Sequence, residues 1–351
     1  MVIKANPITK SNQLFQKLLN HAARYILMIL MVLLLFGIIL LISGKDPIQS
    51  FKDIFISTLG SRYGFSEVIV AMTPILITAL AVALPSRIGL INVGGEGQLY
   101  MGACLATWGA LTFNTWPSWA LIPLMILLGM IGGGLWAFIP GYLKSLGLAN
   151  ETITTLLLNS VAPKIVAFFV FGFWHSPMDT NKTPNFVPAA RLPNFFNSRI
   201  DLSFFIAVVL LAIFWFVMRY TRWGLEMRAI GGNPHAAKRN GLPLNKYWIT
   251  VMCLGGALAG LAGMAQVSGY YGVLLVNFSR GLGYMGFLIS WLSFGDPIGI
   301  LVTSFVVSII VSGGNLLQLT RGIPFAVVNI LLAFTLFVVL ARPIIFAGKK
   351  K

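Results

Sequence analysis

The sequence predicts an all-α protein built as a polytopic bundle of about ten transmembrane helices. Hydrophobic residues make up 57% of the 351 residues and charged residues only 10%, whereas soluble domains carry roughly 25% charged residues. The apolar residues also occur in continuous runs instead of alternating with polar ones. This pattern favours membrane-spanning helices over a transmembrane barrel.

Ten apolar runs are candidates for membrane spans. They fall at residues 25–43, 67–84, 96–113, 119–141, 152–173, 202–218, 248–268, 281–294, 297–313 and 323–341. The run 281–294 is shorter than the ~20 residues that a perpendicular helix needs, so it is either a full span or a re-entrant half-helix. The glycine-rich stretch 88–97 likewise allows two interpretations, a loop or a broken helix.

Basic residues predict which side of the membrane each connection occupies. The N-terminal segment 1–24, the loop 219–247 and the tail 343–351 are rich in Lys and Arg, as cytoplasmic segments are. The formal charge of +16 is then explained by these segments and gives no reason to expect nucleic-acid binding. We therefore expect a transmembrane domain at 25–342 between two cytoplasmic termini, with the loop 219–247 on the cytoplasmic side.

The ten spans divide into five plus five at the boundary before residue 202. An odd number of spans per half places the halves in opposite orientation, as in the inverted repeats of many transporters. Glycine-rich segments that begin at Arg87 and Arg280 interrupt apolar runs at corresponding places, which favours an inverted 5+5 repeat. The GxxxG spacing of Gly129 with Gly133, and of Gly256 with Gly260, predicts close helix packing.

The sequence carries no motif of covalent chemistry. Its three histidines lie in three different regions, and it has no nucleophile elbow, no Cys–His pair and no P-loop. The run 281–286 matches G-x-G-x-x-G, but it lies in a membrane run and lacks the βαβ context of a dinucleotide site. We predict no catalytic residues, no metal site and no cofactor, and ATP hydrolysis only on a separate partner chain.

The loop 219–247 contains a short segment with helix signals at both ends. Asn233 is a good N-cap, Pro234 suits the first helical position, and Gly241 suits the position after the last turn. We expect a helix of about two turns outside the membrane, which suggests docking to a partner; the alternative is a loop element that rests on the membrane surface. This docking segment comprises Asn233, Pro234, His235, Ala236, Ala237, Lys238, Arg239, Asn240 and Gly241.

Polar residues between apolar spans are candidates for a translocation pathway. In the run 89–103 (GLINVGGEGQLYMGA) these are Asn92, Glu96 and Gln98. A carboxylate at a membrane boundary is costly unless it is solvated, paired or functional. Glu96 could equally be an acid in the first turn of a helix, where the helix dipole favours it.

The run 149–159 (ANETITTLLLN) supplies Glu151, Thr154 and Asn159 as further pathway candidates. Structural roles explain part of this run equally well, because Asn150 can cap a helix and Glu151 can complement its N-terminus.

Two more polar residues lie within predicted spans. Asn329 is a weaker pathway candidate in the last span and could instead join helices. Lys164 lies deep in the span 152–173 and needs a partner or a cavity, neither of which the sequence identifies.

Four segments, in the correct order, resemble one transporter family. The run 89–103 resembles the family's GLFNIGAEGQLLIGA, and 149–159 resembles its NEVISTLMLN. The stretch 231–263 resembles GENPEAARYAGI followed by SGALAGLAG, and 295–324 follows the family pattern except at Asp296, where Asn is common. Over residues 66–342 the chain is similar to permease subunits of ABC importers for branched-chain amino acids, ribose and nucleosides, and within them to the nucleoside branch that depends on basic membrane lipoproteins.

The resemblance implies a heteromeric importer in the plasma (inner) membrane of a prokaryote. The expected partners are an ABC ATPase subunit, a second and different permease subunit, an extracytoplasmic substrate-binding lipoprotein and membrane lipid. In the family the segment matching 231–263 touches the ATPase, so the docking segment is expected to receive the ATP-driven motion. The expected solute is a nucleoside, with a simple sugar or a vitamin such as riboflavin as alternatives.

A secondary transporter that works alone is the alternative from another class. Such a protein would use Glu67, Glu96, Glu151 or Asp296 as a proton or sodium site. ATP dependence of uptake separates the two hypotheses, because only the importer needs ATP.

Overall fold

The computed structural model describes residues 44–177 and 179–322, together with 34, 37–38, 40–42, 330 and 333–334. The predicted spans 25–43 and 323–341 lie almost entirely outside the described residues. The segments 1–24 and 343–351 and the pathway candidate Asn329 lie outside them as well. Within the described part no β-strand forms, only isolated bridges, and helices dominate. The predicted all-α class is confirmed.

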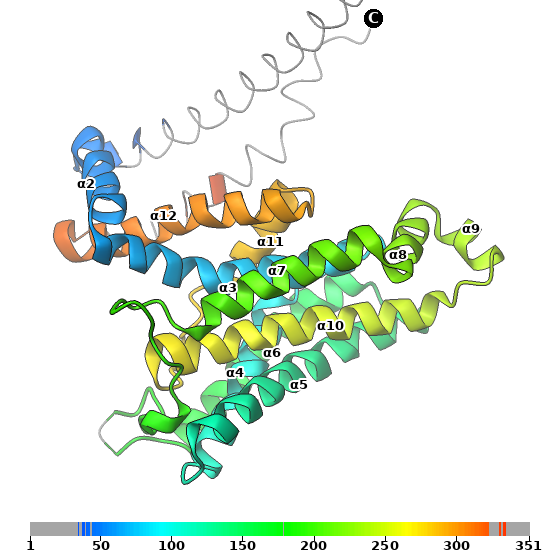
Figure 1. Ribbon diagram of the computed structural model, residues 1–351, viewed down its shortest axis with the longest axis horizontal. Coiled ribbons are helices and arrows are strands. Elements are labelled where there is room, and N and C mark those ends of the chain that lie inside the picture. Colours follow the sequence, from blue (N-terminus) through cyan, green and yellow to red (C-terminus); the bar gives the residue numbers. More distant parts are fainter. Residues whose placement is uncertain are drawn as a thin grey trace, which may run out of the picture. The chain divides into compact units, whose positions relative to one another are not determined.

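Each of the eight predicted spans between residues 67 and 313 coincides with a helix (Figure 1). Six helices in the described part are long and apolar enough to cross a membrane, as expected of a multi-pass membrane protein. The eighth predicted span is a helix of only 11 residues. The helices are α3 (Arg62–Ser86), α4 (Gly95–Thr112), α5 (Ser118–Ser145), α6 (Glu151–Phe171), α7 (Leu202–Tyr220), α10 (Leu244–Ala265), α11 (Leu282–Leu292) and α12 (Pro297–Arg321).

The chain also forms shorter elements and divides into two compact units. The short elements are α2 (Pro47–Leu59), η1 (Pro188–Ala190), α8 (Arg222–Gly232), α9 (Pro234–Arg239) and the π-helical turn η2 (Gln266–Tyr271) that continues α10. One unit comprises residues 1–57 and 313–351, and the other comprises 58–312. The first contains most of α2, which Asp46 caps by accepting a hydrogen bond from the Ile48 N–H at 2.9 Å. The candidate sites lie in the second.

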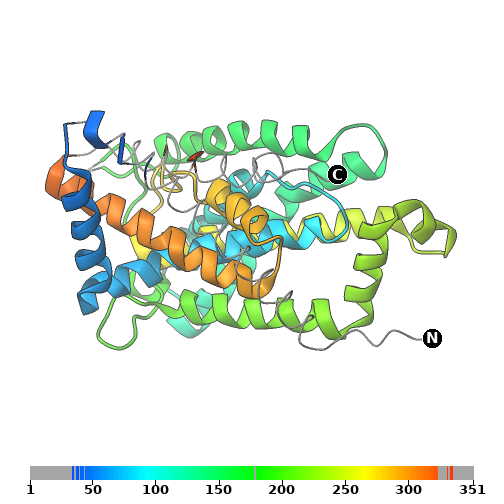
Figure 2. The same ribbon diagram turned by 90° about the horizontal axis from the view of Figure 1, so that it is seen from above.

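The helices of the second unit alternate in direction, so its two ends hold different connections. Near one end, Val70 of α3, Ile122 of α5 and Gly269 of η2 line a common pocket with the loop that follows α6. Near the other end, Gly231 of α8 packs on the backbone of Arg87, directly after α3. Figures 1 and 2 show α8 and α9 projecting from this second end. The loops 174–201 and 219–247 therefore lie at opposite ends, and the assignment of the second end to the cytoplasm stays a prediction.

Glycines bring α4, α5 and α10 into backbone contact at the centre of this unit. A Cβ atom on Gly260 of α10 would clash with the backbone of Gly129 and Gly133 of α5, and a Cβ on Gly102 of α4 would clash with Gly260. Such close approach gains van der Waals contact where lipid supplies no hydrophobic driving force between helices. The glycine pairs with GxxxG spacing therefore serve helix packing, as predicted.

The two glycine-rich breaks of the sequence meet in space. α4 starts at Gly95 after a non-helical stretch, and α11 starts after Gly281, whose φ is +90°. The starts of these helices cross so closely that a Cβ on Gly283 would clash with the backbone of Glu96. Residues 87–94 are thus a non-helical connection between two helices that run in opposite directions, and α4 begins at Gly95. The crossing agrees with an inverted repeat, which stays a hypothesis.

Candidate functional site

The docking segment forms the predicted short helix, α9. Asn233 caps it, since its Oδ1 accepts a hydrogen bond from the Ala236 N–H at 3.0 Å, and Pro234 occupies the first helical position. Gly241 follows with a φ of +82°, a conformation that other residues rarely adopt. Ala237 is buried, whereas most side chains of the segment are exposed. The helix is confirmed, and its docking role stays a prediction.

α8 precedes this segment and was not predicted from the sequence. Thr221 caps it by accepting from the Gly224 N–H at 3.2 Å, and Arg222 pairs with Glu226 at 3.0 Å across one turn. The Tyr247 hydroxyl of α10 also donates to Glu226. This hydrogen bond, together with Arg222, lowers the pKa of the Glu226 carboxyl. The docking segment is therefore joined to the bundle through a second helix that is fastened to α10.

Arg87, directly after α3, contacts three segments from the second half of the chain. Its backbone carbonyl lies against Gly231 of α8, and its guanidinium donates to the Gly295 carbonyl in the turn before α12. The guanidinium also lies 5.7 Å from the centre of the Phe214 ring of α7. Burial lowers the pKa of Arg87, and the nearby Asp296 carboxylate partly offsets this effect. Arg87 thus links α8 and the end of α3 to the turn between α11 and α12.

Three of the predicted pathway residues form hydrogen bonds around the connection between α3 and α4. Asn92 and Gln98 form two reciprocal amide hydrogen bonds of 3.1 and 3.0 Å. Asn159 of α6 accepts from the Gly97 N–H at 2.9 Å and donates to the Val93 carbonyl at 2.9 Å. All three amide side chains are buried. These hydrogen bonds give the three residues a structural role, and their role in a pathway stays a prediction.

Glu96 lies at the start of α4 but caps a different helix. Its carboxylate accepts a hydrogen bond from the Gly283 N–H, in the first turn of α11, at 2.8 Å. Ser279 and the backbone N–H groups of residues 281 and 284 also contribute hydrogen bonds to it. The N-terminus of a helix offers free N–H groups and a positive dipole end, which stabilise a buried carboxylate. Glu96 therefore fastens the two broken segments to each other.

The remaining pathway candidates lie on α6. Asn150 caps this helix, as the structural interpretation of the sequence predicts, with its Oδ1 2.8 Å from the Thr152 nitrogen. Glu151 is buried and forms an ion pair of 2.8 Å with Lys144 of α5. The Thr154 hydroxyl bonds to the Asn150 carbonyl one turn earlier at 2.9 Å. These contacts fasten the start of α6 and leave a pathway role for these residues untested.

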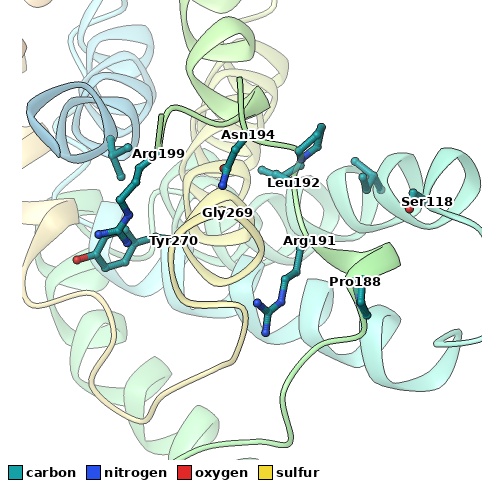
Figure 3. A pocket seen from close by; sticks show the side chains of 11 residues that line it. Ser118, Pro188, Arg191, Leu192, Asn194, Arg199, Gly269 and Tyr270 are labelled. Carbon is teal, nitrogen blue, oxygen red and sulfur yellow. The ribbon is translucent and has the colours of Figure 1, made fainter. Parts of the chain in front are cut away.

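A pocket of about 530 Å³ lies at the end of the bundle opposite α9. Its size is within the roughly 300–1,000 Å³ range of small-molecule sites. Figure 3 shows Arg199 lying over the ring of Tyr270, with Arg191 and Asn194 projecting from the same loop. The lining residues are Val70, Ser118, Ile122, Pro188, Arg191, Leu192, Pro193, Asn194, Arg199, Gly269 and Tyr270.

The two arginines of the pocket differ in their surroundings. Arg199 pairs with Glu67 at 2.7 Å and lies 5.1 Å from the centre of the Tyr270 ring. Arg191 is exposed and forms no ion pair with any residue in the described part of the chain. The pocket thus offers hydrogen-bond donors beside apolar walls, which suits a polar solute with acceptor atoms. No sequence motif predicts this pocket, because a loop and a π-helical turn build it together with residues of α3 and α5.

Comparison with known proteins identifies a family over most of the chain. A family model described as branched-chain amino acid transport system, permease component, matches residues 64–340. The glucose ABC transporter permease protein TsgB13 of Haloferax volcanii is 31% identical over 89% of this chain and 85% of its own length. The solved structure of PsaBC from Streptococcus pneumoniae in complex with Fab is 12% identical, with a TM-score of 0.49 over 83% of this chain and 95% of that chain.

Two further relatives match almost from end to end. The nucleoside ABC transporter permease protein NupB of Lactococcus lactis subsp. cremoris is 31% identical over 93% of this chain and 94% of its own length. The guanosine ABC transporter permease protein NupP of Bacillus subtilis is 30% identical over 95% of this chain and 98% of its own length. The family resemblance stated from the sequence motifs is thereby confirmed.

Proposed function

Because this chain belongs to the family of branched-chain amino acid transport system permease components, we propose that it is the membrane-spanning subunit of an ATP-driven nucleoside importer. The observation that carries the proposal is the family match over residues 64–340, which includes the described spans from α3 to α12. The chain supplies the passage for the solute and is moved by its partner. ATP is hydrolysed on a separate subunit.

The solute assignment rests on two relatives. NupB and NupP, named for nucleoside and guanosine transport, each align over nearly their whole length. The pocket beside Arg191 and Tyr270 supports this assignment, since it offers an aromatic ring and donor groups to a solute of nucleoside size. A base has acceptor atoms for such donors and a face that can contact a ring.

A simple sugar is the second candidate solute. The relative TsgB13, named for glucose transport, is as similar in sequence as the two nucleoside relatives. A sugar would use the donor groups of the pocket but would gain less from the exposed part of the Tyr270 ring. Competition between the two solute classes therefore decides between the two candidates.

The proposed partners are two ATPase subunits, a second and different permease subunit, and an extracytoplasmic binding lipoprotein. In this arrangement α9 faces the cytoplasm and contacts an ATPase, and the pocket near Arg191 faces outward. Closure of the ATPase dimer pushes α9, and α8 passes the movement to Arg87 and thus to the ends of α3 and α11. The solute path then opens alternately to each side, because the partner binds the two states with different affinity.

The alternative of an ion-coupled carrier finds little support in the acidic residues. Glu67 pairs with Arg199, and Glu151 pairs with Lys144. Glu96 caps α11, and the Asp296 carboxylate caps α12 by accepting from the Gly299 N–H at 2.9 Å. Each carboxylate that could bind a proton or sodium ion in a carrier thus already has a structural partner.

Uptake by the complete complex in proteoliposomes tests the proposal. Radiolabelled guanosine should accumulate only with ATP and the binding protein, and a protonophore should not reduce it. Excess unlabelled nucleoside should abolish the signal, whereas excess glucose should leave it unchanged. Loss of uptake on adding the protonophore would support the ion-coupled carrier instead. If excess glucose abolishes the signal and excess unlabelled nucleoside does not, the solute is a sugar and not a nucleoside.

A further inference from the structure

The short helix α2 exposes an apolar face while it buries a serine. Ile48, Phe55 and Ile56 are 80%, 64% and 54% exposed. Ser50, by contrast, is buried, and its hydroxyl donates to the Asp46 carbonyl at 2.7 Å. A helix at the surface of a soluble protein shows the opposite pattern, with its apolar face toward the core. The outward face of α2 therefore needs a medium or a partner that accepts apolar groups.

The chain turns back directly before α2, so the start of α2 lies beside the preceding helix. Residues 40–42 are helical, and Gly44, whose φ is +70°, follows the end of this helix in a turn closed by two backbone hydrogen bonds of 2.9 Å. A Cβ on Gly37 would lie 3.7 Å from the Cβ of Pro47. Pro47 thus lies at the level of Gly37, about 9 Å before the end of the predicted span 25–43, at 1.5 Å per residue.

α12 fixes the level of the middle of α2. A Cβ on Gly313 would lie only 2.6 Å from Cγ2 of Ile54, so the Ile54 side chain packs directly on this glycine. Gly313 is the last residue of the predicted span 297–313. With 13 residues, or about 20 Å, α2 is also too short to cross the ~30 Å hydrocarbon layer. Both neighbours therefore place α2 at the boundary of the membrane.

We propose that α2 lies in the interfacial layer of the membrane, with Ile48, Phe55 and Ile56 inserted among phospholipid chains. Amphipathic helices bind in this way, with the apolar face roughly 5–10 Å below the headgroups. Lys52 lies on the same face, one turn from Ile48 and from Ile56, and its long side chain carries the ammonium group to the lipid phosphates. The inference goes beyond the proposed function, because this surface lies outside both the pocket and the docking segment.

Spin-label accessibility in the reconstituted full chain tests this placement. The native cysteines are replaced (Cys104→Ala, Cys253→Ala), and a nitroxide is attached at Phe55→Cys in vesicles of phosphatidylcholine and phosphatidylglycerol. Two exposed positions serve as references: Asn181→Cys in the loop after α6, and Val209→Cys on the apolar helix α7. Collision of the nitroxide with oxygen reports lipid, and collision with a water-soluble nickel chelate reports water.

The ratio of oxygen to nickel collisions at Phe55→Cys should lie between the two references. We expect it to exceed the ratio at Asn181→Cys about threefold or more, because the label is inserted below the headgroups. A ratio equal to that at Asn181→Cys would overturn the inference, since the face would then lie in water. Little collision with either reagent would overturn it as well, because protein would then cover the face.

Photo-cross-linking extends the test to the assembled importer. Benzoylphenylalanine in place of Phe55 should attach to phospholipid on irradiation, which adds the mass of a lipid to this chain. A cross-link to another subunit in place of lipid would contradict the inference. Neither readout depends on the solute or on ATP, so failure here is distinct from failure of the nucleoside uptake assay.

Discussion

Two regions of the molecule use asparagine side chains in two different ways. At the docking segment, Asn233 caps an exposed helix of six residues and satisfies a backbone N–H that would otherwise face water. At the connection between α3 and α4, Asn92 and Asn159 are buried and form hydrogen bonds with backbone groups of the bundle. The first arrangement leaves most side chains of the segment exposed, whereas the second directs buried amide groups to backbone groups inside the bundle.

The comparison shows why a polar residue in a membrane protein is an ambiguous sign of function. A break in a spanning helix exposes N–H and C=O groups that must be satisfied within the protein. The side chains nearest to the break supply this, and in sequence they look the same as groups that line a pathway. Burial and hydrogen-bond partners, which only the structure gives, separate the two roles.

The largest expected effect is on uptake and comes from a substitution that breaks the α9 helix of the docking segment. Ala237→Pro removes the hydrogen bond from the Ala237 N–H to the Asn233 carbonyl, which measures 3.0 Å, and proline in a helix interior costs ~3 kcal/mol or more. Uptake by the complex should be abolished, while the chain remains in the membrane at its normal level. Ala237→Ser is the control, since it keeps the N–H and the helix. Normal uptake by the proline variant would remove α9 from the mechanism.

A comparably severe change in the buried region should act on stability. Gly260→Ala places a methyl group against the backbone of α5, and overpacking of this kind costs roughly 1–3 kcal/mol or more. The melting temperature of the purified chain in detergent should fall clearly. Gly232→Ala is the matched control, because a Cβ there meets no atom within 4 Å. If the two variants have the same melting temperature, the close packing of α5 and α10 does not stabilise the bundle.

Replacing an asparagine in each region sharpens the comparison. Asn159→Ala leaves the Gly97 N–H and the Val93 carbonyl buried and unsatisfied, which costs roughly 1–3 kcal/mol for each group. Asn233→Ala removes only a cap, at ~1 kcal/mol. We expect Asn159→Ala to lower the melting temperature, and Asn233→Ala to lower uptake with little change in melting. The reverse result would mean that the two regions have exchanged roles.

The smallest expected effect concerns pH at the link between α8 and α10. The lowered pKa of Glu226 means that its hydrogen bond with Tyr247 stabilises the fold above the ordinary glutamate pKa of 4.5 and is lost as the pH falls through the lowered value. At pH 7 the melting temperature of Tyr247→Phe should therefore be slightly lower than that of the natural chain. The difference between the two melting temperatures should become smaller below about pH 4.5. A difference that grows on acidification would contradict this assignment.

Much of the fold follows from the sequence, because a membrane span is a long apolar run with a simple length requirement. All eight predicted spans in the described part are helices, and the cap at Asn233 was recognisable from one residue type at one position. α8 escaped prediction because it is short and contains three glycines, although Thr221 before it and Arg222 with Glu226 within it were usable signals.

The candidate sites were less predictable, since they depend on contacts between distant segments. Glu96 meets the start of α11 across 187 positions of sequence, and Arg87 meets Gly295 across 208. No local pattern contains either partner.

The central claim is that this chain is a passive permease moved through α9 by an ATPase. Purified chain reconstituted alone in liposomes tests it most directly, with a guanosine gradient, an ion gradient and ATP supplied in turn. The account predicts no accumulation against the gradient under any of these conditions, and accumulation once the ATPase, the second permease subunit and the binding protein are added. Uphill accumulation by the chain alone would contradict it.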